Sequence, residues 1–184
     1  GVDIVKLAEE RETPLLLMSE SRLRENCRTF FNTFSKQYKN IKVYYSVKTN
    51  YNLDVLRVIK DEGAGAETAS GMEIYLCLKA GFDPSQIILD GPCWTPKEIE
   101  YALENKIAIF NIDSLSALER LDKTASKLKT KAKICFRINP NIKIPFFRRF
   151  VDVYIKRFGI HIDQAMSAYE KAAGMPNIET VGVN

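Results

Sequence analysis

The segment that ends near Lys48 contains the residues of this sequence best suited to chemistry. The run Tyr45-Ser46-Val47-Lys48-Thr49-Asn50 closes a stretch rich in β-branched and aromatic residues, which is typical of a β-strand. A lysine flanked by apolar residues at a strand end can lose solvation, and its amine is then suited to forming a Schiff base with a carbonyl compound. The alternative interpretation is an ordinary solvated lysine at the end of a strand.

Histidine and cysteine chemistry is less well supported. His161 is the single histidine, whereas imidazole ligands of zinc usually occur in pairs or beside closely spaced cysteines. A His-based hydrolytic triad would have to use this residue. The four cysteines, Cys27, Cys77, Cys93 and Cys135, lie far apart and form no C-x-x-C pair. We therefore expect buried free thiols rather than disulfides, and no metal site.

Six strand-like segments alternate with helix-like segments along the chain. The first five begin roughly 20 to 26 residues apart, which is the length of one strand plus one helix. Repeated units of this kind predict a parallel sheet, open or closed into a barrel. Lys48 would then lie at the carboxyl edge of the sheet, where barrel enzymes build their active sites. The predicted strands are residues 41–47, 64–69, 86–89, 107–112, 133–138 and 179–183.

Apolar spacing and capping residues predict helices between these strands. Residues 20–35 place apolar side chains on one helical face. Thr95-Pro96-Lys97-Glu98 combines an N-cap, a proline at the first helical position and a capping-box glutamate. Ser114 can cap the next helix, and Asp163 can cap a last helix that runs to about Ala173.

The overall composition predicts an ordinary soluble protein. Hydrophobic residues make up 46% and charged residues 27%, and no apolar run approaches the ~18 residues that a membrane span needs. We therefore expect a cytoplasmic protein that does not associate with membranes. The net charge is only +4, and the basic residues are interleaved with acidic ones along the chain. This distribution argues against nucleic-acid binding. The basic and aromatic loop at residues 140–157 is weak evidence for RNA by itself, although loops of this length are often functional.

Seven short segments, in order, resemble the ornithine/diaminopimelate/arginine decarboxylase family. The segment around Lys48 resembles the family's cofactor-lysine signature, and Gly65-Ala66-Glu67-Thr68-Ala69-Ser70 resembles its second strand, G-x-D-x-x-S. Leu7-Ala8-Glu9-Glu10 followed by Thr13-Pro14 resembles the opening of diaminopimelate decarboxylases. The other matching segments are Leu89-Asp90-Gly91-Pro92, Asn111-Ile112-Asp113-Ser114, Phe136-Arg137-Ile138-Asn139-Pro140 and Lys156-Arg157-Phe158-Gly159-Ile160.

The resemblance implies an α/β fold, the N-terminal part of a (β/α)8 TIM barrel of the alanine racemase-like type, truncated after about six strands. Residues 1–18 would be a lead-in whose Leu15–Met18 strand joins a C-terminal β domain absent from this chain. Residues 19–184 would be the partial cofactor-binding barrel. Because the family's phosphate loop and C-terminal domain would follow residue 184, we expect this fragment alone to be inactive. The full-length protein is expected to be a homodimer.

The resemblance also implies pyridoxal 5'-phosphate as the cofactor, held covalently by Lys48, which is the predicted catalytic residue. Glu67 stands where the family has an aspartate close to the Schiff base. Arg137 matches a family arginine close to the cofactor, although it could instead form a salt bridge at the barrel top. Ser70 and Asp90 match family positions at strand ends, although each could simply cap the following helix. The predicted cofactor-binding residues are Lys48, Glu67, Ser70 and Arg137.

The implied function is the decarboxylation of a basic or diamino acid by a pyridoxal-phosphate-dependent carboxy-lyase. The opening segment favours meso-diaminopimelate as the small-molecule substrate and L-lysine as the product. Ornithine, arginine and carboxynorspermidine-type substrates remain alternatives. A second class of alternatives keeps the barrel and the cofactor without decarboxylation, as in a racemase or a pyridoxal-phosphate homeostasis protein. A third, a non-catalytic regulatory relative, is disfavoured by the presence of Lys48.

Overall fold

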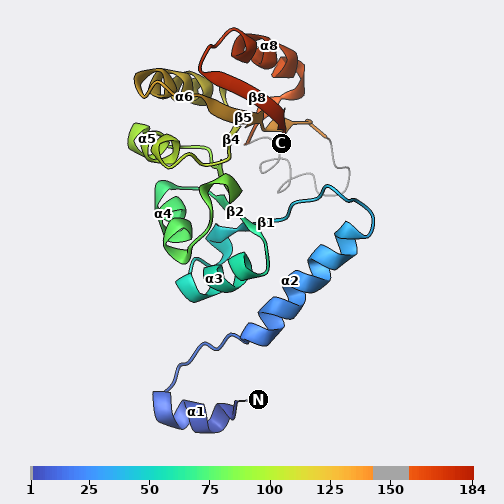
Figure 1. Ribbon diagram of the computed structural model, residues 1–184, viewed down its shortest axis with the longest axis vertical. Helices are drawn as coiled ribbons and strands as arrows, with labels where there is room; N and C mark the ends of the chain where they lie inside the picture. Colours follow the sequence, from blue (N-terminus) through green and yellow to red (C-terminus); the bar gives the residue numbers. More distant parts are fainter. Residues whose placement is uncertain (1, 143–157) are drawn as a thin grey trace. The chain divides into compact units, whose positions relative to one another are not determined.

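The computed structural model describes residues 2–142 and 158–184 (Figure 1). By its internal contacts the chain divides into two units, Gly1–Ile41 and Lys42–Asn184. Most of the basic and aromatic loop predicted at residues 140–157 lies outside the described residues. The predicted domain boundary between residues 18 and 19 stays a prediction.

The first unit contains two helices, α1 (Ile4–Arg11) and α2 (Glu20–Ser35). Helix α2 confirms the helix predicted at residues 20–35, and the Ser19 side chain caps it by accepting a hydrogen bond from the Arg22 N–H. Helix α1 was not predicted. Residues Leu15–Met18 between the two helices form no strand in the described chain, so their pairing with another domain stays a prediction.

The second unit is built on a six-stranded parallel sheet with the order β1-β2-β3-β4-β5-β8. The strands confirm all six predicted strand positions and the α/β fold class, although most are shorter than predicted. A separate pair, β6 (Ile138–Asn139) and β7 (Ile160–His161), follows β5. The six strands are β1 (Tyr44–Ser46), β2 (Gly65–Thr68), β3 (Ile87–Asp90), β4 (Ile109–Ile112), β5 (Ala132–Phe136) and β8 (Ile178–Val183).

Helices connect the strands and lie along one side of the sheet in Figure 1. They are α3 (Leu53–Asp61), α4 (Gly71–Ala80), α5 (Pro96–Glu104), α6 (Leu115–Lys127) and α8 (Ile162–Ala173), with short 3-10 turns η1 (Val47–Thr49) and η2 (Pro84–Gln86). The predicted cap of the last helix was wrong. His161 is its N-cap, because the imidazole Nδ1 accepts a hydrogen bond from the Asp163 N–H at 3.3 Å, which places Asp163 inside the first turn.

The two faces of the sheet differ in burial, and this difference sets where a site can form. Leu89, Phe110 and Ile134 are in register on three neighbouring strands and at most 2% exposed, so this face packs under the helices. On the opposite face, Ile88 and Ile109 are also in register but remain partly exposed. Side chains alternate between the two faces of a sheet along each strand. Near each strand end, every second side chain therefore lies on the partly exposed face.

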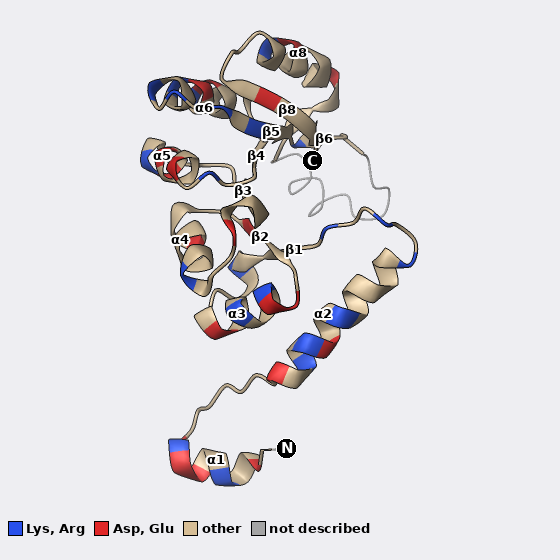
Figure 2. Ribbon diagram, in the orientation of Figure 1, with Lys and Arg blue, Asp and Glu red and all other residues tan. Residues whose placement is uncertain are grey.

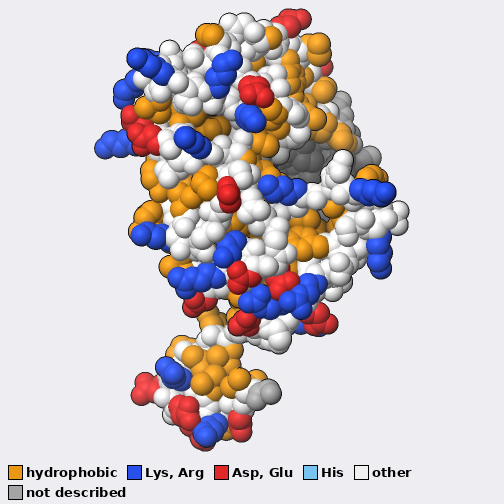
Figure 3. Space-filling model, in the orientation of Figure 1, with side chains coloured by type: hydrophobic (Ala, Val, Ile, Leu, Met, Phe, Trp, Pro, Cys, Tyr) orange, Lys and Arg blue, Asp and Glu red, His pale blue; other side chains and the backbone are white. Residues whose placement is uncertain are grey.

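Charged side chains of both signs alternate on the helices (Figure 2) and over the molecular face seen in Figure 3. Some of them link neighbouring helices: Lys127 on α6 pairs with Glu100 on α5 at 3.0 Å, and Lys171 on α8 pairs with Glu119 on α6. Every helix in the described part of the chain is too short or too polar to cross a lipid bilayer.

The capping box predicted at Thr95 and Glu98 is confirmed and also ties two helices together. The Glu98 carboxylate accepts hydrogen bonds from the Thr95 N–H at 2.9 Å and the Thr95 hydroxyl at 2.8 Å. It also accepts one from the Gly71 N–H of α4 at 2.9 Å. Burial acts to raise the pKa of Glu98, but these hydrogen bonds outweigh it and hold that pKa below its usual value.

Replacing Glu98 with alanine is expected to lower the stability of the protein by roughly 1 to 3 kcal/mol at neutral pH, since it removes a cap and a bridge to α4. Because the pKa of Glu98 is depressed in the folded state, this contribution disappears as the pH falls through that depressed pKa. Chemical unfolding at several pH values measures the effect. Glu104→Ala, at an exposed position of the same helix, is the control, and an equal loss in both variants would contradict the prediction.

Candidate functional site

Lys48 lies where the chain leaves the carboxyl end of β1. It is the middle residue of η1, which directly follows the strand and lies against β2. Its side chain is exposed in this chain, so the loss of solvation expected from its apolar neighbours is not present here. Its apolar neighbour Val47 is instead fully buried. The lysine amine is thus accessible at the carboxyl edge of the sheet.

Glu67 lies on the partly exposed face of the sheet, next to the strand that carries Lys48. Ser46 of β1 and Glu67 of β2 are in register, and the Glu67 side chain is partly buried. The extended backbone therefore presents the glutamate on the same face as Ser46, two residues before Lys48. Ser70 follows β2 and is the N-cap of α4, accepting a hydrogen bond from the Glu73 N–H at 3.3 Å. The capping alternative for Ser70 is confirmed, and its contact with a cofactor stays a prediction.

Arg137 follows β5 and pairs with a carboxylate two strands away. Its guanidinium lies 3.8 Å from the Asp90 carboxylate at the end of β3, which confirms the salt bridge considered as the alternative role of Arg137. Asp90 does not cap the following helix, as had been one interpretation, because Thr95 is the N-cap of α5. Asp90 is in register with Asn111, on the partly exposed face that also carries Glu67.

Arg137 is also held by the segment that begins at residue 158. The Phe158 ring lies against the guanidinium, with 5.0 Å between its centroid and the central carbon. The backbone of Arg137 is fixed on both sides, since its N–H donates to the Ile112 carbonyl and its carbonyl accepts from the Ile160 N–H, both at 2.8 Å. Arg137 is therefore fixed both along the chain and across the sheet.

Asp113 completes this group of charges just after β4. Burial raises the pKa of Asp113, while the hydrogen bond from Ser114 and the charge of Arg137 act to lower it and the charge of Asp90 acts to raise it. In the sequence, Asp113 belongs to the family-like segment Asn111-Ile112-Asp113-Ser114, which by itself indicates no role for this carboxylate. The carboxylate of Asp113 thus lies close enough to Arg137 and Asp90 to respond to both.

Replacing Asp113 with asparagine is expected to raise the unfolding temperature at neutral pH. Because the pKa of Asp113 is raised in the folded state, folding favours the protonated form, and stability is lost as the pH rises through that raised pKa. Asparagine stays uncharged, so the variant does not lose stability in this pH range. The difference in unfolding temperature between the variant and the parent should therefore shrink as the pH is lowered. Thermal unfolding of both proteins from acidic to neutral pH measures the difference, and an advantage that is larger in acid would contradict the prediction.

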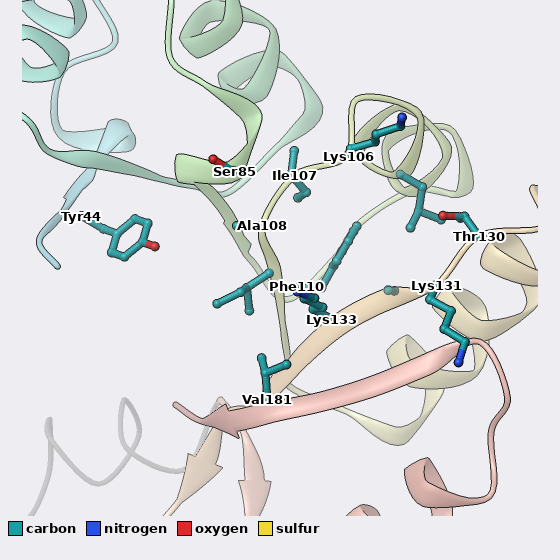
Figure 4. Close-up of a pocket in the computed structure, with 13 residues that line it drawn as sticks. Tyr44, Ser85, Lys106, Ile107, Ala108, Phe110, Thr130, Lys131, Lys133 and Val181 are labelled. Carbon is teal, nitrogen blue, oxygen red and sulfur yellow. The ribbon is translucent and has the colours of Figure 1, made fainter. Parts of the chain in front are cut away.

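A hollow of about 510 Å³ lies at the other end of the strands (Figure 4). Its lining includes Tyr44 of β1 and Val181 of β8, together with Phe110 and Lys133. Since β1 and β8 are the two edge strands of the sheet, the sheet must curve around this space, as in a barrel. The amino ends of barrel strands usually serve stability, so we do not assign the chemistry to this hollow.

The remaining candidates from the sequence have structural roles. The four cysteines are thiols rather than disulfides, as predicted, but only Cys77 is buried, whereas Cys27 and Cys135 are half-buried and Cys93 is exposed. Burial raises the pKa of the Cys77 thiol to about 12, so this thiol is unreactive at neutral pH. His161 caps α8, because its Nδ1 accepts a hydrogen bond from the Asp163 N–H.

Comparison with known protein families gives one match over most of the chain. Residues 24–184 match the pyridoxal binding domain of the pyridoxal-dependent decarboxylases. Diaminopimelate decarboxylase of Methanothermobacter thermautotrophicus is 36% identical over 185 residues, and that of Aquifex aeolicus is 33% identical over 186 residues. Both alignments cover 100% of this chain but only 42% and 43% of the respective relatives, so the chain spans less than half their length.

Solved structures agree with this match. The crystal structure of diaminopimelate decarboxylase from M. jannaschii in complex with L-lysine superposes with a TM-score of 0.89 at 32% identity, covering 100% of this chain and 44% of that one. The six-stranded sheet thus corresponds to the N-terminal part of the barrel in that structure.

Proposed function

Because this chain belongs to the family of pyridoxal-dependent decarboxylases, as the match of residues 24–184 to their pyridoxal binding domain shows, we propose that it forms the lysine-bearing part of the active site of such an enzyme. Pyridoxal phosphate is the cofactor of this family. The observation that carries the proposal is the position of Lys48, an exposed lysine at the carboxyl end of the first barrel strand.

The side chains around this edge fit such a cofactor. Lys48 offers an accessible amine for a carbonyl group, and Arg137 offers a fixed positive charge for an anionic group. The partly exposed face of the sheet leaves these groups open to a ligand. Lys48, Glu67 and Arg137 are therefore proposed as cofactor-binding residues, with Ser70 as a fourth whose main role is to cap α4.

These residues would divide the work of the site between attachment and electrostatics. The Lys48 amine would hold the cofactor covalently. The Glu67 carboxylate would favour a positive charge on the Lys48 nitrogen. Arg137 would orient anionic groups by its charge. When bound, pyridoxal phosphate supplies an electron sink for the electron pair left by the departing carboxylate.

We propose meso-diaminopimelate as the substrate and L-lysine as the product. This is supported by the two relatives named above at 33% and 36% identity and by the match of this fold to a structure that contains L-lysine. Ornithine, arginine or carboxynorspermidine-type substrates are the alternatives within the family. The complete protein is proposed to be a cytoplasmic homodimer whose residues 1–18 pair with a C-terminal domain.

Reductive trapping tests the proposal directly. The protein from the complete reading frame is incubated with pyridoxal phosphate and reduced with borohydride, and the modified peptide is mapped by mass spectrometry. We expect one stable adduct, on Lys48. Release of carbon dioxide from meso-diaminopimelate, ornithine and arginine is then measured with the same preparation. No adduct, or adducts spread over several lysines, would overturn the proposed function, whereas an adduct on Lys48 with release from ornithine alone would overturn only the substrate.

A further inference from the structure

Asp90 is a charged residue that no part of the proposed chemistry has used. It lies at the end of β3 with a side chain that is 15% exposed. A carboxylate loses much of its hydration at such a position, which is unfavourable unless a partner compensates for the loss. Helix capping does not explain it, because Thr95 caps α5. The partner that the structure provides is Arg137, whose guanidinium is 3.8 Å away.

The distance of 3.8 Å describes an ion pair rather than a short hydrogen bond. Partly buried pairs of this kind contribute little net stability, because the cost of removing both charges from water offsets their attraction. Their effect on geometry is larger, since each charge limits the directions that the other can take. We therefore expect Asp90 to affect the orientation of Arg137 more than the stability of the fold.

The remaining contacts of Arg137 restrict other parts of the residue. Phe158 covers one side of the guanidinium, and the Arg137 backbone is bound to Ile112 and Ile160. Asp113 adds a second carboxylate just after the intervening strand, β4, and its pKa responds to both Arg137 and Asp90. Phe158 and the backbone contacts do not fix how far the Arg137 side chain extends across the sheet. The two carboxylates set this extension, and Asp90 is the one within ion-pair distance.

We propose that Asp90 is a positioning residue, which fixes the Arg137 guanidinium at the carboxyl edge of the sheet for the binding of the cofactor and substrate. The inference rests on the proposed function. Asp90 touches neither reactant in this role and acts only through Arg137. Without it, the arginine keeps its charge and its aromatic neighbour but loses the contact that draws it toward β3.

Substitutions in the complete holoenzyme test this role. Asp90→Asn keeps the size of the side chain and removes its charge, and we expect kcat/KM to fall about 10- to 100-fold, as for a misplaced binding group. The dissociation constant of pyridoxal phosphate, measured by titrating the apoprotein, should rise in parallel. Asp90→Glu should restore part of both. Glu100→Gln, which removes an exposed ion pair between α5 and α6, should change neither.

A double-mutant cycle separates positioning from a general structural role. If Asp90 acts through Arg137, the double variant Asp90→Asn/Arg137→Gln should be no worse than Arg137→Gln alone, in cofactor affinity and in kcat/KM. Additive losses, or an Asp90→Asn variant equal to the parent, would overturn the positioning role while the parent protein still forms its adduct on Lys48. A parent without that adduct would overturn the proposed function, and the role of Asp90 with it.

Discussion

Replacing Lys48 with alanine in the complete protein is expected to reduce the proposed decarboxylation by at least about 1,000-fold, since it removes the amine that is proposed to hold the cofactor covalently. Lys48 is exposed in a 3-10 turn after β1, so truncating its side chain removes no packing. The fold should therefore survive, with an unchanged circular dichroism spectrum and unfolding temperature. Carbon dioxide release and borohydride-stable cofactor content measure the loss.

Two further variants show whether this loss comes from the amine or from its charge. Lys48→Arg keeps the positive charge but offers no amine that forms a Schiff base under these conditions, and it should be as inactive as the alanine variant. Lys79→Ala, at an exposed position of α4 where the lysine lies over the Tyr75 ring, should retain full activity. A Lys48→Arg variant with near-normal activity would exclude a covalent role and leave only an electrostatic one.

Replacing Gly159 with alanine is expected to give the largest loss of stability, about 2 to 5 kcal/mol, because two separate costs add at this residue. Gly159 has φ of +84°, which is unfavourable for any residue with a Cβ atom. An added Cβ would also lie 2.7 Å from the Arg137 carbonyl oxygen, a contact that requires the backbone to shift. The displacement would reach Phe158 and Arg137, so activity should fall as well.

Two other glycines separate the causes of this effect. Gly63 has φ of +88° but no atom within 4 Å of an added Cβ, so Gly63→Ala carries only the conformational cost of about 1 kcal/mol. Gly174 has φ of −81° and only an ordinary contact at 3.5 Å, so Gly174→Ala should be close to neutral. The unfolding temperatures should therefore rank Gly174→Ala above Gly63→Ala and Gly63→Ala above Gly159→Ala. Equal values for the last two would show that the contact with Arg137 carries no cost.

The sequence by itself determined the order and type of the main elements of the barrel part. The strands are short runs rich in apolar and β-branched residues. Helices such as α2 and α5 show their caps and apolar spacing in their own sequence, so each element can be identified without knowing its neighbours. Lys48 was placed at a strand end for the same reason. The order of seven short segments was enough to indicate the family that the comparisons confirm.

Helices and caps with weaker local signals were predicted less well. The segment before residue 18 is interpreted as a lead-in of the family pattern, and α1 is not predicted because its eight residues are too few to establish a helical repeat. Asp163 was chosen as the cap of α8 because aspartate is a common N-cap, whereas histidine at residue 161 performs that function through a ring nitrogen. Residue preferences at N-caps favour aspartate. Only the path of the backbone shows which side chain lies where it can accept the hydrogen bond.

The contacts that assemble the candidate site were decided by tertiary structure alone. Asp90, Asp113 and Arg137 meet because three consecutive strands lie side by side in parallel with fixed register, and the sequence states neither the pairing nor the register. For the same reason, the sequence does not show that Asp90 is the partner in the salt bridge considered for Arg137. Charges interact through space at distances of a few ångströms, so their partners depend on which strand ends are adjacent, whereas the strands themselves are determined by local patterns of residues.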